Sequence, residues 1–104
     1  MDTREYLIPI GSAVFDPIHR TIRAPDGRWE KLTALEAELL FLLAVQIGSR
    51  VARDELAKTW GHLGISPSNP YRKTVGRLRK PLSRIVPEAE IVCENQAYTL
   101  RIRS

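Results

Sequence analysis

The stretch that decides the fold is residues 70–86, PYRKTVGRLRKPLSRIV. Its apolar residues recur at spacings of four, three, four and three: Tyr71, Val75, Leu78, Leu82 and Ile85. This spacing is typical of one face of an α-helix. Its charged residues are six cations and no acid: Arg72, Lys73, Arg77, Arg79, Lys80 and Arg84. Such a helix can dock on a core and present positive charge to a polyanion.

The totals of the chain narrow the class of protein. Outside residues 70–86 there are ten basic and twelve acidic residues, so the net charge of +4 comes from that one stretch. A length of 104 residues predicts one domain, 1–104, with its own core. The longest run without Asp, Glu, Lys or Arg has thirteen residues, 59–71, whereas a membrane span needs about 20. A pI near 9.6 suits nucleic acid, an anionic membrane surface or an acidic protein, and composition does not choose among them.

The N-terminal third, residues 1–32, predicts a small antiparallel sheet of three or four strands. Short apolar and β-branched segments alternate there with turn residues, including Gly11, Pro17 and Gly27. Trp29 falls in the last segment, and we expect it to pack on the sheet.

A buried helix is expected next, over residues 34–47. Thr33 and Glu36 have the spacing of a capping box, and Gly48 is the expected stop. The apolar middle, residues 39–45, is also compatible with a buried strand, but the length and the cap favour a helix.

A second helix is expected over residues 53–60, followed by a loop rich in Gly, Ser and Pro over residues 61–69. Asn69 is the expected cap of the basic helix, with Pro70 in its first position. Ser66 offers a competing start for the same helix, three residues earlier.

The C-terminal end predicts a hairpin. Residues 90–94 and 97–103 flank Asn95 and Gln96, and the second strand alternates apolar and polar side chains. Cys93 lies in the first strand, where we expect a half-buried structural thiol.

A series of partial motifs runs along nearly the whole chain: DG at 26–27, LTALE at 32–36, ELL at 38–40, GSRV at 48–51, RDEL at 53–56, WG at 60–61, VGRLRKPL at 75–82 and AYTL at 97–100. In this order the chain resembles the winged helix-turn-helix effector domain of the OmpR/PhoB type, including its ToxR/CadC-like branch. The resemblance implies an α+β fold with an N-terminal antiparallel sheet over 1–32, three helices within 33–86 and a C-terminal hairpin wing over 90–103. Trp60 and Tyr98 match core positions of that family.

The resemblance also implies a function. It is that of a bacterial, two-component-like transcription regulator that binds specific sequences of double-stranded DNA. The third helix would enter the major groove and the wing the adjacent minor groove. It further implies homodimers on direct repeats, and RNA polymerase as a partner of the loop after the second helix: His62, Leu63, Gly64 and Ile65.

The expected DNA contacts divide into three sets. If Val75 and Leu78 face the core, four residues project to the opposite side as base contacts: Lys73, Gly76, Arg77 and Lys80. Arg77 matches the base-reading arginine of the family, whose planar fork pairs with guanine O6 and N7. Residues further round are assigned to phosphates: Arg72, Thr74, Arg79 and Arg84. Thr74 is also compatible with a solvent-facing position. In the wing, Asn95 and Gln96 are the expected contacts.

Four positions depart from the family pattern. In the wing, Ala97 replaces the usual glycine and Glu94 the frequent arginine. Ala52 stands at the usual Ser or Thr cap of the second helix. Pro81 lies inside the third helix, where it removes a hydrogen bond to the Arg77 carbonyl and should kink the axis.

Other interpretations of the basic helix remain open. It is compatible with a solvated cationic surface, with a winged helix repurposed to meet an acidic protein partner, and with non-specific nucleic-acid binding. No triad spacing, phosphate loop or metal cluster is evident, and His19 and His62 are expected on the surface. We therefore expect no enzyme activity, cofactor, metal or small-molecule substrate. The expected localisation is cytoplasmic, as a free regulator or as the cytoplasmic domain of a longer, membrane-anchored one.

Overall fold

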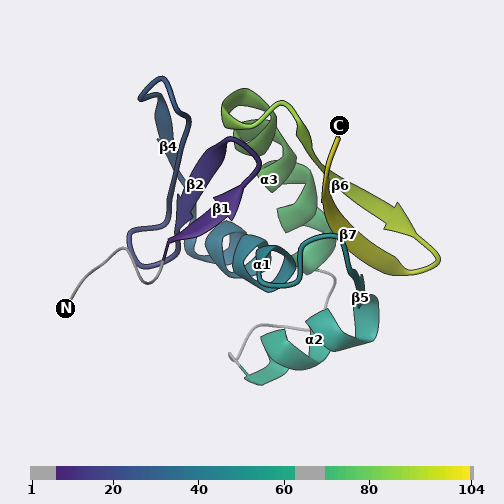
Figure 1. Cartoon of the computed structure of the whole chain (residues 1–104). Helices are drawn as coiled ribbons and strands as arrows, with labels where there is room; N and C mark the ends of the chain where they lie inside the picture. The colour runs from purple at the N-terminus through teal and green to yellow at the C-terminus, as the bar shows by residue number, and fades with distance from the viewer. Residues whose placement is uncertain (1–6, 63–69, 104) are drawn as a thin grey trace.

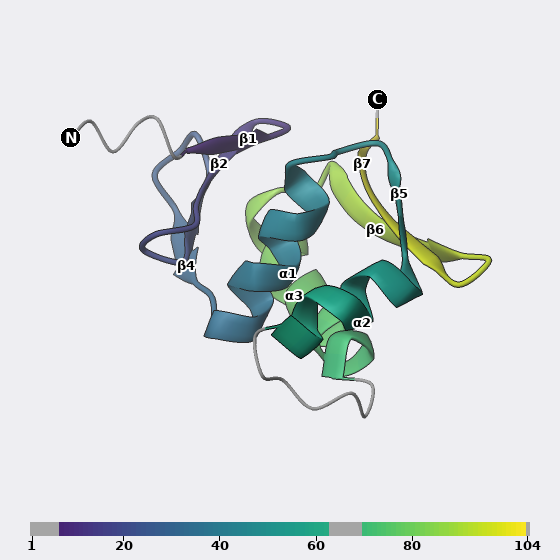
Figure 2. The same ribbon diagram turned by 90° about the horizontal axis from the view of Figure 1, so that it is seen from below.

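The computed structural model describes residues 7–62 and 70–103, except the side chains of 59–62, 70 and 71. Two small sheets lie on either side of a helical layer (Figures 1 and 2). The elements follow in chain order: β1 (Ile8–Ile10), β2 (Ala13–Asp16), β3 (Thr21–Arg23), β4 (Trp29–Lys31), α1 (Ala34–Ala44), β5 (Arg50–Ala52), α2 (Arg53–His62), α3 (Pro70–Ile85), β6 (Ala89–Glu94) and β7 (Ala97–Ile102). The α+β winged helix-turn-helix expected from the sequence is confirmed.

The N-terminal sheet is an antiparallel meander of β1 to β4. Phe15, Ile22 and Glu30 lie in one cross-strand row, and Phe15 and Ile22 are fully buried. Because side chains alternate along a strand, Trp29 points to the other face, where it is 55% exposed. The expectation that Trp29 packs on the sheet was therefore wrong, since its neighbour Glu30 takes the inward position.

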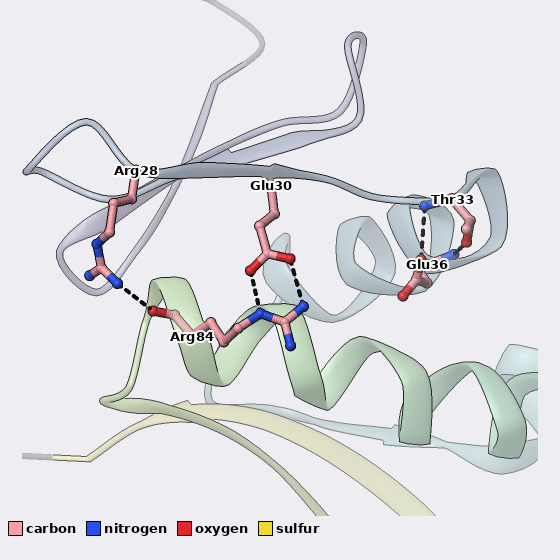
Figure 3. A network of polar contacts seen from close by, with 5 residues as sticks. All are labelled: Arg28, Glu30, Thr33, Glu36 and Arg84. Atoms are coloured by element: carbon pink, nitrogen blue, oxygen red, sulfur yellow. Dashed lines mark hydrogen bonds and ion pairs between the residues drawn. The ribbon is translucent and has the colours of Figure 1, made fainter.

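Helix α1 begins with the predicted capping box. The Glu36 backbone N–H donates to Thr33 Oγ1 at 3.2 Å, and the Thr33 N–H donates to Glu36 Oε1 at 2.9 Å (Figure 3). The helix ends at Ala44, three residues earlier than expected. Gly48 then donates its N–H to the Leu100 carbonyl at 2.8 Å, so the chain leaves the helix early to join the C-terminal sheet.

A short strand that the sequence did not predict follows α1. In β5, Val51 is buried between two exposed residues. The strand pairs antiparallel with β7, with Val51 opposite Tyr98. The C-terminal sheet therefore has three strands in the order β5-β7-β6 rather than the two of a simple hairpin.

Helix α3 is the central element of the fold. It contacts α1, β3, β4 and β6, and it runs through Pro81 without interruption. Its buried side chains include Val75, Leu78, Leu82 and Ile85, and Leu78 has no exposed surface. The apolar stripe predicted from the sequence is thus the face that holds α3 on the core.

The wing formed by β6 and β7 extends beyond the helices (Figure 1). Tyr98 is 5% exposed, which confirms its predicted core position. Cys93, directly opposite Tyr98, is exposed, so the expected half-buried thiol was wrong. In β6 the side chains of Ala89 and Ile91 are buried, whereas Cys93 lies nearer the tip of the wing, where the core no longer covers the strand. None of the helices in the described part of the chain is long and apolar enough to cross a membrane.

Candidate nucleic-acid interface

One side of α3 is an exposed cationic face. Its four predicted base-contact residues are all exposed: Lys73, Gly76, Arg77 and Lys80. The helix contains no acidic residue, and no ion pair to Lys73, Arg77 or Lys80 occurs within the described residues. Lys73 and Lys80 are seven residues apart, which is two turns or about 10 Å along the axis.

Two arginines flank this face and touch the wing sheet. Arg79 donates from Nη2 to the Ile91 carbonyl at 3.0 Å, which leaves its other N–H groups for a ligand. Arg72 lies near the Tyr98 hydroxyl. Burial raises the pKa of this hydroxyl, and the Cys93 thiol raises it further, whereas the Arg72 side chain acts to lower it. Both arginines are exposed, so they can still reach phosphates beside the cationic face.

Thr74 does not belong to this surface. It is 4% exposed, although it was assigned to phosphate contact or to solvent. It lies four residues before Leu78 and so shares the buried side of the helix. The assignment of Thr74 to a phosphate was therefore wrong.

Arg84 is bound within the protein rather than free at the end of the cationic face. Its Nε and Nη2 each donate to the Glu30 carboxylate at 2.6 Å. Arg28 Nη1 donates to the Arg84 carbonyl at 3.2 Å (Figure 3). The Arg84 hydrogen bond lowers the pKa of Glu30. We expected Arg84 to be free to bind phosphate, and this two-bond ion pair with Glu30 corrects that expectation. The pair forms only because β4 packs on α3.

The wing turn presents the two predicted polar residues. Asn95 and Gln96 are exposed and have φ angles of 49° and 60°. Positive φ at both central residues is what a two-residue type I′ hairpin turn requires. The Arg53 N–H donates to the Gln96 carbonyl at 2.9 Å, which ties this turn to the start of α2.

Strand β5 brings an arginine to the wing that the sequence did not single out. Arg50 is exposed, and its Nη2 lies 3.5 Å from the Glu94 carbonyl oxygen. The positive charge of Arg50 thus lies beside the backbone of Glu94, whose exposed carboxylate is near the tip of the wing. The only sequence signal was the β-branched Val51 between Arg50 and Ala52, which is too short a pattern to identify a strand.

Other predicted site residues have a simpler outcome. The expected polymerase-contact residues Leu63, Gly64 and Ile65 lie outside the described residues, as does the side chain of His62. His19 is on the surface as expected, 63% exposed and 2.7 Å from Asp16. Among the described residues no group of three potential metal ligands occurs.

Solved structures with the same arrangement include two DNA-binding domains and the C-terminal domain of a response regulator. The DNA-binding domain of CadC from E. coli superposes with a TM-score of 0.78 at 22% identity, over 92% of each chain. The C-terminal domain of the nisin resistance regulator NsrR, a lantibiotic response regulator, gives 0.78 at 17% identity, over 93% of this chain and 99% of that one.

The DNA-binding domain of CpxR from E. coli gives a TM-score of 0.69 at 23% identity, over 94% of this chain and 98% of that one. The chain therefore has the winged-helix fold of these domains, in agreement with the fold expected from its resemblance to the OmpR/PhoB type. No protein-family model and no curated sequence relative matches the chain. At these identities the likeness establishes the fold, and the function has to be argued from the surface of α3.

Proposed function

We propose that this winged helix binds specific sequences of double-stranded DNA as the effector domain of a bacterial transcription regulator, with α3 in the major groove. The observation that carries the proposal is the exposed face of α3, where Lys73, Arg77 and Lys80 have no acid on their own helix. A B-DNA major groove admits an α-helix, and Arg or Lys on its exposed face can reach guanine O6 and N7. Domains of the same fold from CadC and CpxR are described as DNA-binding.

The residues divide into roles by position. Lys73, Arg77 and Lys80 would meet base edges, and Gly76 between them would let the helix backbone approach closely. Arg72 and Arg79 would hold phosphates on the flank nearer the wing and fix the register without reading sequence. Asn95 and Gln96, held by β5 and α2, would contact the adjacent minor groove.

The regulatory partners belong to the same proposal. RNA polymerase would be met by residues 62–65, and homodimers would form on direct repeats. Both roles rest on the resemblance to the OmpR/PhoB type. A role at the chromosome would place the domain in the cytoplasm.

The test is selection of duplexes from a random pool, followed by affinity measurements at two salt concentrations. A repeated enriched half-site, lost in Arg77→Ala, is the expected result. The matched control is Arg23→Ala, which removes the same charge from an exposed position at the end of β3 in the N-terminal sheet. Arg23 lies opposite Trp29 in the sheet, so both side chains point away from the core. This variant should therefore keep the enriched motif.

The competing function is a protein-interaction module, favoured by the exposed Glu94 at the wing tip, which would repel phosphate. That module would bind duplexes weakly, with strong salt dependence and no enriched motif. Equal behaviour of Arg77→Ala and Arg23→Ala on selected and scrambled duplexes would contradict the DNA-reading role and favour the module.

A further inference from the structure

The ion pair between Glu30 and Arg84 joins the N-terminal sheet to the last turn of α3 (Figure 3). Both donor–acceptor distances are 2.6 Å. The fork geometry satisfies both carboxylate oxygens, which makes it more specific than a single contact. The side chains of Arg84 and Glu30 are 58% and 28% exposed, so a competing anion in solvent can reach the arginine.

Arg84 belongs by position to the cationic face of α3. It lies four residues after Lys80 and seven after Arg77, and residues at these spacings share one helix face. Lys80 and Arg77 have no acidic partner within the described residues. Arg84 is therefore the member of this face that the protein itself neutralises.

The partner is fixed in place by its strand. Arg28, two residues before Glu30, donates to the Arg84 carbonyl at 3.2 Å and pairs with Asp26 at 2.7 Å. The first contact joins the start of β4 to the end of α3 and the second fixes the Arg28 side chain, and neither involves the Glu30 side chain. Removing the charge of Glu30 should therefore release the Arg84 guanidinium without detaching the strand.

We infer that Glu30 withholds Arg84 from DNA phosphates and so sets where the DNA-binding surface of α3 ends. The inference rests on the proposed function. A freed Arg84 would add one sequence-independent phosphate contact, which strengthens binding to every duplex. Glu30 thus limits non-specific affinity, and it is a specificity-determining residue that need not touch DNA itself.

The experiment compares Glu30→Gln with the wild-type chain on a selected and a scrambled duplex across a salt series. We expect Glu30→Gln to bind both duplexes about three- to tenfold more tightly at low salt, with the slope of log K against log salt steeper by about 0.9. Adding Arg84→Ala should abolish the gain.

The matched control is Glu90→Gln. Glu90 pairs with Arg101 at 2.6 Å, and the two side chains are 29% and 56% exposed. Glu90 also lies 3.9 Å from Arg103. These contacts are on the wing sheet, so the change in charge is the same and an arginine is again released, but α3 gains no free cation. An equal gain in Glu90→Gln would overturn the inference, because it would show a general effect of net charge.

Two further outcomes would also overturn it. An unchanged salt slope in Glu30→Gln would show that Arg84 does not reach phosphate. A loss of affinity confined to the selected duplex would show that Glu30 positions the helix instead. Failure of the proposed function has a different signature: wild-type binding with no preference for the selected duplex, whatever Glu30→Gln does to the slope.

Discussion

Leu78 has no exposed surface on one side of α3, whereas Arg77, its neighbour in sequence, is exposed on the other. Contacts with the rest of the fold hold the buried side, and no described acidic partner satisfies Lys73, Arg77 or Lys80 on the exposed side. The two faces should therefore respond differently to mutation. Changes on the buried face should lower stability, and changes on the exposed face should alter binding while leaving the fold intact.

The largest effect is expected on the buried face. Leu78→Ala should lower the free energy of unfolding by about 2–5 kcal/mol, because it leaves a cavity in a packed core. Urea unfolding followed by circular dichroism measures this change. A loss below about 1 kcal/mol, in the range of a surface substitution, would mean that α3 is held mainly by something other than its apolar face.

Arg77→Ala, one position away, should leave unfolding within about 0.5 kcal/mol of wild type, as for other exposed sites. At its cognate base it should weaken binding by about 1–3 kcal/mol. Unfolding and duplex titration on the same preparation give both values. A large loss of stability would show that Arg77 has a structural partner and would remove the contrast between the faces.

A glycine on the exposed face offers a stabilising change. Gly76 is exposed, and an added Cβ would meet no atom within 4 Å. Gly76→Ala should raise stability by about 1 kcal/mol through helix propensity, but weaken duplex binding if the backbone approaches the bases there. Ser83→Ala, seven residues further along the same side of α3, tests whether an effect on binding is confined to the position of Gly76. Unaltered affinity in Gly76→Ala would argue against a close approach.

The sequence predicted the two faces of α3 because sixteen residues give several turns of a helical pattern. It failed where segments are short. The strand β5 has three residues, of which only Val51 is buried, so no alternation can be recognised. Strand β4 also has three residues, too few to predict which of its side chains face inward. The inward position of Glu30 is explained only by its ion pair with Arg84 in the folded protein.

Prediction of the site failed at the borders of the helical face for the same reason. Thr74 lies close enough to the apolar stripe that packing decides its exposure. The state of Arg84 depends on a strand 54 positions away in sequence, and no local pattern contains that information. The central residues, Lys73, Arg77 and Lys80, were predictable because they lie opposite the stripe.

The smallest effect is expected at the boundary itself, where Glu30 meets Arg84. The hydrogen bond from Arg84 lowers the pKa of Glu30 in the folded protein. The pair therefore contributes stability above the pKa of an unfolded glutamate, about 4.3, and this contribution is lost as the pH falls through the lower folded value. The Tm of wild type should thus fall more than that of Glu30→Gln between about pH 5 and pH 3.

Thermal unfolding of both forms at matched ionic strength checks this difference. Asp26 and Glu88 also have lowered pKa values, through hydrogen bonds from Arg28 and Ser12 respectively. They remain in the variant, so only the difference between the two curves reports on Glu30. Parallel curves would mean that the ion pair adds nothing to folding. Arg84 would then be held by geometry alone, and a phosphate could displace Glu30 at little cost in stability.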